Sequence, residues 1–266
     1  MGAIHTRTWP AMLAAAACIV APALHAQGRE EAKLITATSV MTELRESRDQ
    51  QIPQWLLDRA YGIVVVPDVV KVGFWLAGRH GKGVMVVRND AGRFSNPVFV
   101  NLSGGSFGPQ IGAQSTDVVL VFTTRKGVEG ITDGKVTLGA DASVAAGPVG
   151  RQATAATDTS FKAEVYSYSR SKGLFAGVAL DGSAITIDDK SNAAFYGKKA
   201  SAGEILKGSV STNSNGAQRF LAAVSASTSP VAATATSTAE APANPPAQAE
   251  TASGVKTYPL EEAPAK

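Results

Sequence analysis

The spacing of hydrophobic positions predicts a helix at the start of the folded part of the chain. Across residues 29–50, apolar side chains recur at intervals of three and four, with charged side chains between them. Pro53 follows this segment, and residues 53–62 are typical of a second, short helix that ends at a glycine. The apolar positions of the first helix are Leu34, Ala37, Met41 and Leu44.

From Gly62 onward the pattern changes to that of strands. Residues 63–67 and 117–122 are short, continuous β-branched runs, as in buried strands, and residues 135–147 alternate between apolar and polar. Residues 78–83, Gly-Arg-His-Gly-Lys-Gly, separate two apolar runs, so we expect a turn between two antiparallel strands there. Further strands are expected over 162–170, 174–180 and 184–187.

The end of the folded domain is marked by two short helices, near 189–196 and 201–208. Ser201 and Glu204 form a capping-box pattern at the start of the second helix. Beyond about residue 210 the chain is mostly Ala, Ser, Thr and Pro, which bury too little apolar surface to offset the entropy of ordering. We therefore expect a domain over 29–212 and a disordered tail over 222–266.

Together these elements predict an α+β fold. Its main component is an antiparallel β-sheet, with an N-terminal helix and short C-terminal helices. The frequent glycines indicate a strongly bent sheet, either barrel-like or sandwich-like, and the sequence does not choose between the two.

The first 26 residues have the layout of a secretory signal peptide. Arg7 precedes a short apolar run that ends in small residues, and cleavage is expected after Ala26, with Ala23 as the alternative. The mature protein would then be periplasmic or secreted. Cys18 is an alternative lipoprotein attachment point, although Ala15 stands where such sites prefer leucine.

Charge and composition exclude several classes of function. Removal of residues 1–26 leaves 24 Lys and Arg against 22 Asp and Glu, far from the balance of a nucleic-acid-binding protein. It also leaves no cysteine and a single histidine, His80, so a Cys/His zinc site or a Ser-His-Asp triad cannot be built. We therefore expect no metal, no cofactor and no catalytic residues.

Two short motifs with catalytic or nucleotide-binding associations do not fit their context. Residues 78–83 lack the spacing of a phosphate-binding P-loop, and a strand follows them where a P-loop needs a helix. Residues 169–172, Ser-Arg-Ser-Lys, match the Ser-x-x-Lys pattern of penicillin-recognising enzymes, but they close a strand and no Lys-Thr-Gly follows.

Basic side chains near the predicted turns are the candidates for binding an anion. If these turns meet at one end of the sheet, their cations form a patch that can hold a negatively charged headgroup. The alternative is that they are ordinary solvated turn residues. The candidates are Arg79, Lys82, Arg88, Arg170 and Lys172.

A glycine-rich block, residues 103–112, lies where side chains would otherwise alternate. We expect at least one of its glycines to adopt a positive φ or to let another backbone approach closely. These positions are Gly104, Gly105, Gly108 and Gly112.

Several blocks resemble the SYLF domain family. They are GFWLAGRHGKGVMVVRNDAGRFSNPVFVNLSGGSFGPQIGAQSTDVVLVF, GADASVAAGPVGR and AEVYSYSRSKGLFAGVALDGSAI, and the similarity runs from about Leu34 to Val210. The resemblance implies binding of phosphoinositides or other acidic lipids, actin binding in the eukaryotic branch, and no enzymatic activity. An exported chain would meet no eukaryotic actin in its own compartment.

The family's lipid contact is ascribed to a basic, amphipathic N-terminal segment, which corresponds here to residues 29–50. The membrane-contacting candidates are Lys33, Leu34, Met41 and Arg45. This segment is net acidic, whereas an electrostatic anchor requires excess positive charge. The alternative is a helix packed against the sheet.

Two functions therefore remain open after the sequence analysis. The first is an exported, non-catalytic module that binds anionic lipid headgroups on a membrane surface. The second is a protein-interaction or envelope-structural module with a protein partner that the sequence does not identify.

Overall fold

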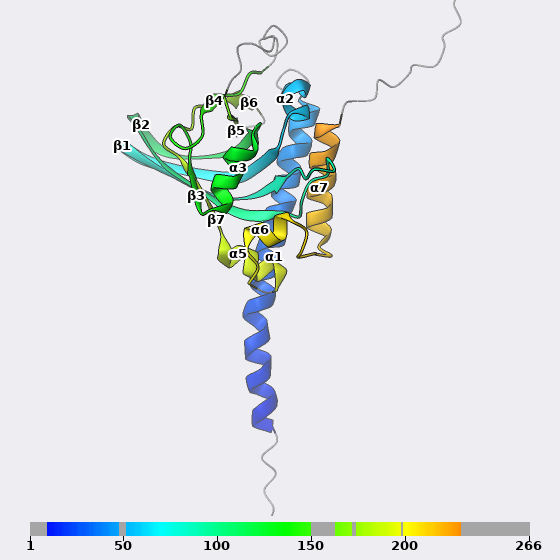
Figure 1. Cartoon of the computed structure of the whole chain (residues 1–266). Coiled ribbons are helices and arrows are strands. Elements are labelled where there is room, and N and C mark those ends of the chain that lie inside the picture. Colours follow the sequence, from blue (N-terminus) through cyan, green and yellow to red (C-terminus); the bar gives the residue numbers. More distant parts are fainter. Residues whose placement is uncertain (1–9, 48–51, 150–162, 172–173, 198, 230–266) are drawn as a thin grey trace, which may run out of the picture. The chain divides into compact units, whose positions relative to one another are not determined.

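The computed structural model describes residues 10–47, 52–149, 163–171, 174–197 and 199–229, with only the backbone for 10–26, 73–77 and 106–113. Helices and strands alternate irregularly along the chain (Figure 1). The helices are α1 (Pro10–Glu46), α2 (Gln54–Asp58), α3 (Arg125–Thr132), α5 (Asp189–Tyr196), α6 (Ala202–Leu206) and α7 (Asn215–Thr228). The strands are β1 (Gly62–Val87), β2 (Val98–Phe122), β3 (Lys135–Thr137), β4 (Val144–Ala146), β5 (Val165–Ser171), β6 (Leu174–Gly177) and β7 (Ala184–Ile187).

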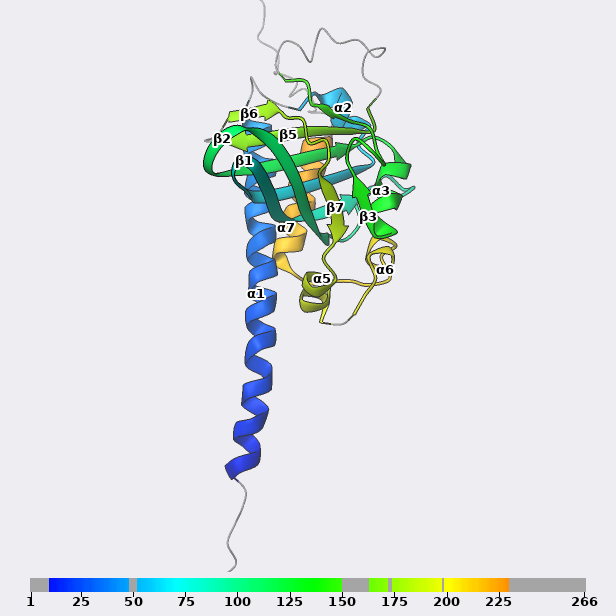
Figure 2. The ribbon, with the colours of Figure 1, turned by 90° about the vertical axis from the view of Figure 1, so that its left-hand side faces the viewer.

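The described strands form one curled, seven-stranded sheet (Figure 2). Its main path is β3-β7-β2-β5-β4, while β1 pairs with β2 and β6 pairs with β5. The pairing of β4 with β5 is parallel, and the other named pairs are antiparallel. The predicted α+β class with a mainly antiparallel, bent sheet is confirmed. The single strand expected over 135–147 is instead divided into β3 and β4 by a turn in which Gly139 has a φ of 87°.

The turn expected at residues 78–83 is wrong, because these residues lie inside β1. This 26-residue strand pairs with β2 from Gly62↔Phe122 to Met85↔Val98, with irregularities between Val66 and Val69 and between Phe74 and Leu76.

Glycine is needed in β1 because the strand folds back onto itself. A Cβ on Gly83 would collide with the backbone oxygen of Val65 and lie 2.8 Å from the Cα of Val66. A Cβ on Gly81 would lie 2.8 Å from methyl carbons of Val66 and Val69. The glycines therefore allow the second half of β1 to lie directly against the first half.

Two hydrophobic clusters pack on the two faces of the sheet. Helices α1, α2, α5 and α7 contribute to one cluster, and α3 and α6 contribute to the other. Leu34 and Met41 are fully buried in the first cluster. The expectation that these two side chains contact a membrane is therefore wrong, and the alternative, a helix packed against the sheet, describes this part of α1.

Helix α1 begins earlier than expected and is continuous through Ala26, where cleavage is predicted. It ends at Glu46, four residues before the predicted end at residue 50. Within the described part of the chain, no helix combines the length and the apolar character needed to cross a membrane.

The C-terminal helices include one that the sequence analysis missed. Helices α5 and α6 lie where they were predicted, and Ser201 and Glu204 form the expected capping box. Helix α7 follows and buries Phe220 and Val224, so the tail boundary expected at residue 222 falls inside a packed helix. The remainder of the predicted tail, residues 230–266, lies outside the described residues.

Candidate functional site

The five cations expected to form one basic patch are dispersed. Arg79 and Lys82 are three positions apart on β1, so their side chains project from opposite faces of the strand. Arg170, on β5, lies beside two carboxylates: its Nη1 is 2.5 Å from Glu43 Oε2 and its Nε is 2.9 Å from Asp117 Oδ2. Lys172 lies outside the described residues.

The Lys82 ammonium is paired with a carboxylate of the fold, and this leaves it no open site for a ligand. Its ammonium lies 2.5 Å from the carboxylate of Asp188, which is the N-cap residue of α5 and also accepts hydrogen bonds from Ser191. Burial by itself would raise the pKa of Asp188, but the hydrogen bonds from Lys82 and Ser191 outweigh burial and lower that pKa. Lys82 therefore ties β1 to the start of α5.

Arg88, another of the predicted cations, lines a pocket in the described part of the chain. Its Nη1 donates a hydrogen bond of 3.0 Å to the Asp58 carbonyl, and its guanidinium lies 5.0 Å from the centre of the Phe94 ring. The pocket has a volume of about 590 Å³ and lies between the β1–β2 turn, α3 and the end of α6.

The turn that forms one wall of this pocket is shaped by Asn89 and Gly92. The Asn89 side-chain oxygen accepts hydrogen bonds from the backbone N–H groups of Ala91 and Arg93, and Gly92 has a φ of 75°. Asn96 donates a hydrogen bond of 2.7 Å to the Val210 carbonyl, which ties the turn to the segment after α6. The wall is therefore fixed by hydrogen bonds at both ends.

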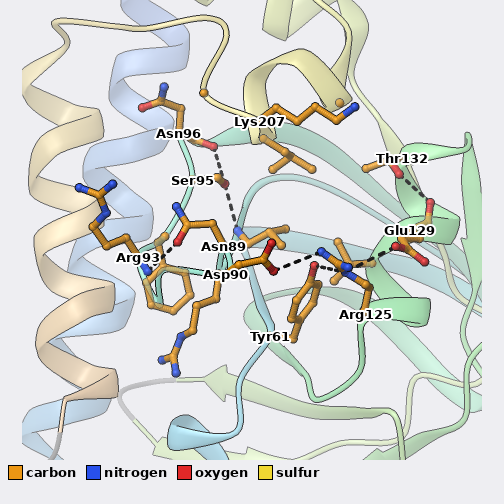
Figure 3. Close-up of a pocket in the computed structure, with 17 residues that line it drawn as sticks. Tyr61, Asn89, Asp90, Arg93, Ser95, Asn96, Arg125, Glu129, Thr132 and Lys207 are labelled. Atoms are coloured by element: carbon orange, nitrogen blue, oxygen red, sulfur yellow. Dashed lines mark hydrogen bonds and ion pairs between the residues drawn. The ribbon is translucent and has the colours of Figure 1, made fainter.

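Arg125, the first residue of α3, is the central cation of the pocket (Figure 3). Its Nε donates a hydrogen bond of 2.8 Å to the Tyr61 hydroxyl, whose ring lies 5.6 Å from the guanidinium. The hydrogen bond with Tyr61 is the largest cause of a raised Arg125 pKa, and the carboxylates of Asp90 and Glu129 raise it further. Each carboxylate is 3.6 Å from Arg125, too far for a good hydrogen bond.

The pocket carries an excess of positive charge. Arg93, Arg125 and Lys207 are exposed, and Arg88 is half-buried. The carboxylates that line the pocket are Asp90 and Glu129. We call the pocket formed around these six side chains the basic pocket. It can receive an anionic group that displaces the loosely placed carboxylates from Arg125.

Sequence reasoning missed three of the four cations of the basic pocket. Arg93, Arg125 and Lys207 belong to a turn, a helix start and a helix end that are far apart in the sequence. No local motif joins them. The useful local signal is the Asn-Asp-Ala-Gly sequence at 89–92, which is typical of a turn and places Arg93 at the wall of the pocket.

The remaining predicted site residues lie elsewhere. On α1, Lys33 is half-buried and Arg45 is exposed, beside the buried Leu34 and Met41. In the glycine block, a Cβ on Gly104 would lie 2.7 Å from Ser183 Oγ and 2.9 Å from its Cα, so this glycine lets Ser183 approach closely. Gly105 and Gly112 are opposite Gly78 and Gly73 in the hairpin, and Gly108 lies in its irregular part.

The described residues hold no group of three or more His, Cys, Asp or Glu side chains that could bind a metal ion. The basic pocket presents hydrogen-bond donors and positive charge instead. Its chemistry is that of a binding site for an anion.

Comparison with known proteins identifies the family. Residues 103–227 match the Ysc84 family model, described as "Las17-binding protein actin regulator". The chain is 38% identical over 190 residues to LAS seventeen-binding protein 3 of Saccharomyces cerevisiae, covering 70% of this chain and 41% of that protein. It is 41% identical over 165 residues to Protein YSC84 of the same yeast, covering 61% and 35%.

A human protein is also similar in sequence to this chain. SH3 domain-containing YSC84-like protein 1 of Homo sapiens is 32% identical over 186 residues, covering 70% of this chain and 54% of that protein. The chain thus spans about half or less of the length of these curated relatives. It carries a domain of the Ysc84 family, and the predicted SYLF resemblance is confirmed.

Proposed function

We propose that the chain is a non-catalytic binding module that holds the anionic headgroup of an acidic lipid in the basic pocket. The observation that carries this proposal is that three exposed cations, Arg93, Arg125 and Lys207, line one open pocket, with Arg125 at its centre (Figure 3). These three exposed cations come from separate elements, whereas the cations Lys82 and Arg170 already lie against carboxylates of the fold.

Arg125 is suited to be the main ligand of a phosphate-bearing headgroup. A guanidinium offers donors in a rigid plane and binds phosphate through paired hydrogen bonds. Tyr61 uses the Nε donor of Arg125 and orients the guanidinium, which leaves the terminal nitrogens for the ligand. Lys207 and Arg93 add positive charge at the rim, where salt screens it.

Vesicle co-sedimentation tests this proposal. The full chain is mixed with phosphatidylcholine vesicles that contain or lack phosphatidylserine, and the Arg125→Glu/Lys207→Glu variant is compared with wild type. We expect about tenfold weaker binding of the variant to the acidic vesicles, since two phosphate or carboxylate contacts become repulsive. Phosphoinositide-containing vesicles test the headgroup that the family resemblance implies.

The matched control is Lys135→Glu/Lys190→Glu. Both lysines are exposed, neither lines the basic pocket, and the change in net charge is the same. Equal losses in the two double variants would mean that net charge, and not the basic pocket, governs binding, and this would contradict the proposal.

Export is a separate part of the proposal. We infer that the chain acts outside the cytoplasm after cleavage behind Ala26, a proposal supported by the apolar run with a small-residue end in residues 1–26. The intact mass of the mature protein tests it. A mass that retains residues 1–26 contradicts cleavage, and a lipid adduct on Cys18 supports the lipoprotein alternative.

Protein binding is a second candidate function, favoured by the names of the related proteins. The family description and the name of one yeast relative state Las17 binding, and other relatives are named as SH3 domain-containing proteins. The basic pocket would then receive an acidic segment of a protein partner. Capture of the chain by immobilised Las17, lost in Arg125→Glu/Lys207→Glu, together with no binding to acidic vesicles, would favour this second function.

A further inference from the structure

Arg79 is a half-buried cation without a partner among the residues that the structure describes. Its Nε is buried and makes no hydrogen bond. Burial lowers the pKa of Arg79, and no neighbouring charge contributes to the shift. This differs from Lys82 and Arg170, which lie against carboxylates.

The position of Arg79 follows from the alternation along β1. Gly83 and Gly81 face the first half of the strand, where they meet Val66 and Val69. Arg79 is two residues further along the same face. Its side chain therefore projects from the inner face of the folded-back β1–β2 hairpin.

A second unpartnered polar group lies on this face. Arg79 is directly opposite Gly104 in the register of β1 and β2, and the missing side chain of Gly104 leaves room for Ser183. Opposite residues in an antiparallel pair project to the same face with Cβ positions about 5 Å apart. Ser183 is fully buried, and its hydroxyl makes no hydrogen bond.

This arrangement lowers the stability of the folded protein unless a ligand binds to these two groups. A buried donor without a partner and a half-buried charge without a counterion both destabilise the folded protein. The guanidinium can donate to two oxygens of one ligand, and the Ser183 hydroxyl can donate to a third oxygen. A tetrahedral phosphate supplies three oxygens on one side, whereas a carboxylate has two in total.

We propose that Arg79 and Ser183 form an anion site, separate from the basic pocket, that binds a phosphate group. The phosphate belongs either to a free small molecule or to a lipid headgroup, because the donors recognise the same oxygens in both. Gly104 is a positioning residue of this site, since any side chain there would displace Ser183.

Thermal unfolding of the full chain tests the site with inorganic phosphate as the probe, against chloride at equal ionic strength. Ligand binding to the folded state raises the melting temperature, by about 3 °C once phosphate exceeds its dissociation constant about tenfold. We expect this rise in wild type and in Arg125→Glu/Lys207→Glu, whose change lies in the basic pocket. We expect its loss when Arg79→Met is added to Arg125→Glu/Lys207→Glu, and a smaller rise when Ser183→Ala is added to the same variant.

A second prediction concerns the melting temperature of Arg79→Met in the absence of phosphate. This variant should then melt above wild type, because an unpaired half-buried charge is replaced by an apolar side chain of similar length. If Arg79 only stabilised the fold, Arg79→Met would instead melt below wild type. Greater stability together with loss of the phosphate response is the signature of a ligand-binding residue.

The source of the phosphate is distinguished by vesicles of phosphatidylcholine with and without phosphatidic acid. If phosphatidic acid vesicles bind Arg125→Glu/Lys207→Glu but not the same variant with Arg79→Met added, while inorganic phosphate has no effect, the site takes a lipid headgroup. If inorganic phosphate alone stabilises wild type through Arg79, the site takes a free ligand. If neither response depends on Arg79, the proposal is overturned, whatever the result for the basic pocket.

Discussion

The Glu31 carboxylate in α1 accepts a hydrogen bond of 2.6 Å from the backbone N–H of Gly216 in α7, although the two residues are 185 positions apart. The other oxygen of Glu31 accepts from the Ser214 hydroxyl, and Ser214 is the N-cap residue of α7. A carboxylate at a helix N-terminus satisfies free N–H groups and interacts favourably with the helix dipole. Glu31 therefore fixes the start of α7 on α1.

The first prediction concerns this contact. Glu31→Gln should lower the free energy of unfolding by about 1 kcal/mol or more, since it removes the charge that accepts two hydrogen bonds at the start of α7. Urea unfolding measures the change. Glu46→Gln removes an exposed carboxylate from the other end of α1 and is the control. Equal stability of the two variants would contradict a capping role for Glu31.

The second prediction concerns the close contact between the two halves of the folded-back strand β1. Gly83→Ala should destabilise the fold by about 2 kcal/mol or more, because the added methyl group collides with backbone atoms that cannot move independently. Gly78→Ala is the matched control, since a Cβ there meets no atom within 4 Å. If both variants unfold at the same denaturant concentration, the close approach of the two halves of β1 is not present in solution.

The third prediction locates the end of the domain. Truncation after Ala222 should lower the melting temperature, because it removes Val224 and the last turn of α7 from the core. Truncation after Ser229 removes the Ala, Ser, Thr and Pro-rich segment, which by composition contributes little buried apolar surface, and should leave the melting temperature unchanged. Melting curves of the two truncated chains check this, and identical curves would show that the domain ends at or before Ala222.

The fourth prediction is a pH dependence that arises from Asp188. Its pKa is lowered in the folded state, so its contribution to stability is present above the unfolded-state pKa of about 3.9 and is lost as the pH falls through the lower, folded-state value. In Asp188→Asn, the free energy of unfolding should therefore fall less steeply than in wild type as the pH is lowered into the acid range. Denaturant unfolding across acid pH measures this, and a fall as steep as that of wild type would show that Asp188 does not contribute.

The elements that the sequence predicted best are those with local signals. Helix α6 has its capping box within four residues, Ser201 to Glu204, and α5 ends at Gly197, which has a φ of 68°. In both cases the information that sets the boundary lies within the helix or next to it. The hydrophobic period of α1 likewise identified the side chains that are buried, although not what covers them.

The elements that the sequence missed depend on distant contacts. Residues 78–83 have the local composition of a turn, and only the contact of Gly81 and Gly83 with Val65, Val66 and Val69 shows why glycines belong in a strand. Helix α7 has few large apolar residues, and its N-terminus is capped by Glu31.

The candidate site was the least predictable part. The sequence identified cations near turns, but it could not show that Lys82 and Arg170 have carboxylate partners. It also could not bring Arg93, Arg125 and Lys207 together, because the packing of α3 and α6 places them around one pocket. Charge pairing between distant residues is a property of the fold.

The central claim, that the basic pocket binds an anionic headgroup, is tested most directly by a variant that should gain affinity. Asp90→Asn/Glu129→Gln removes the carboxylates that compete for Arg125. Its affinity for phosphatidylserine vesicles is measured against wild type and against Glu46→Gln/Asp189→Asn, a control with the same charge change at exposed positions outside the basic pocket. The account predicts binding several-fold tighter than that of the control. Affinity equal to the control, or no binding to acidic vesicles by any of the three proteins, would contradict it.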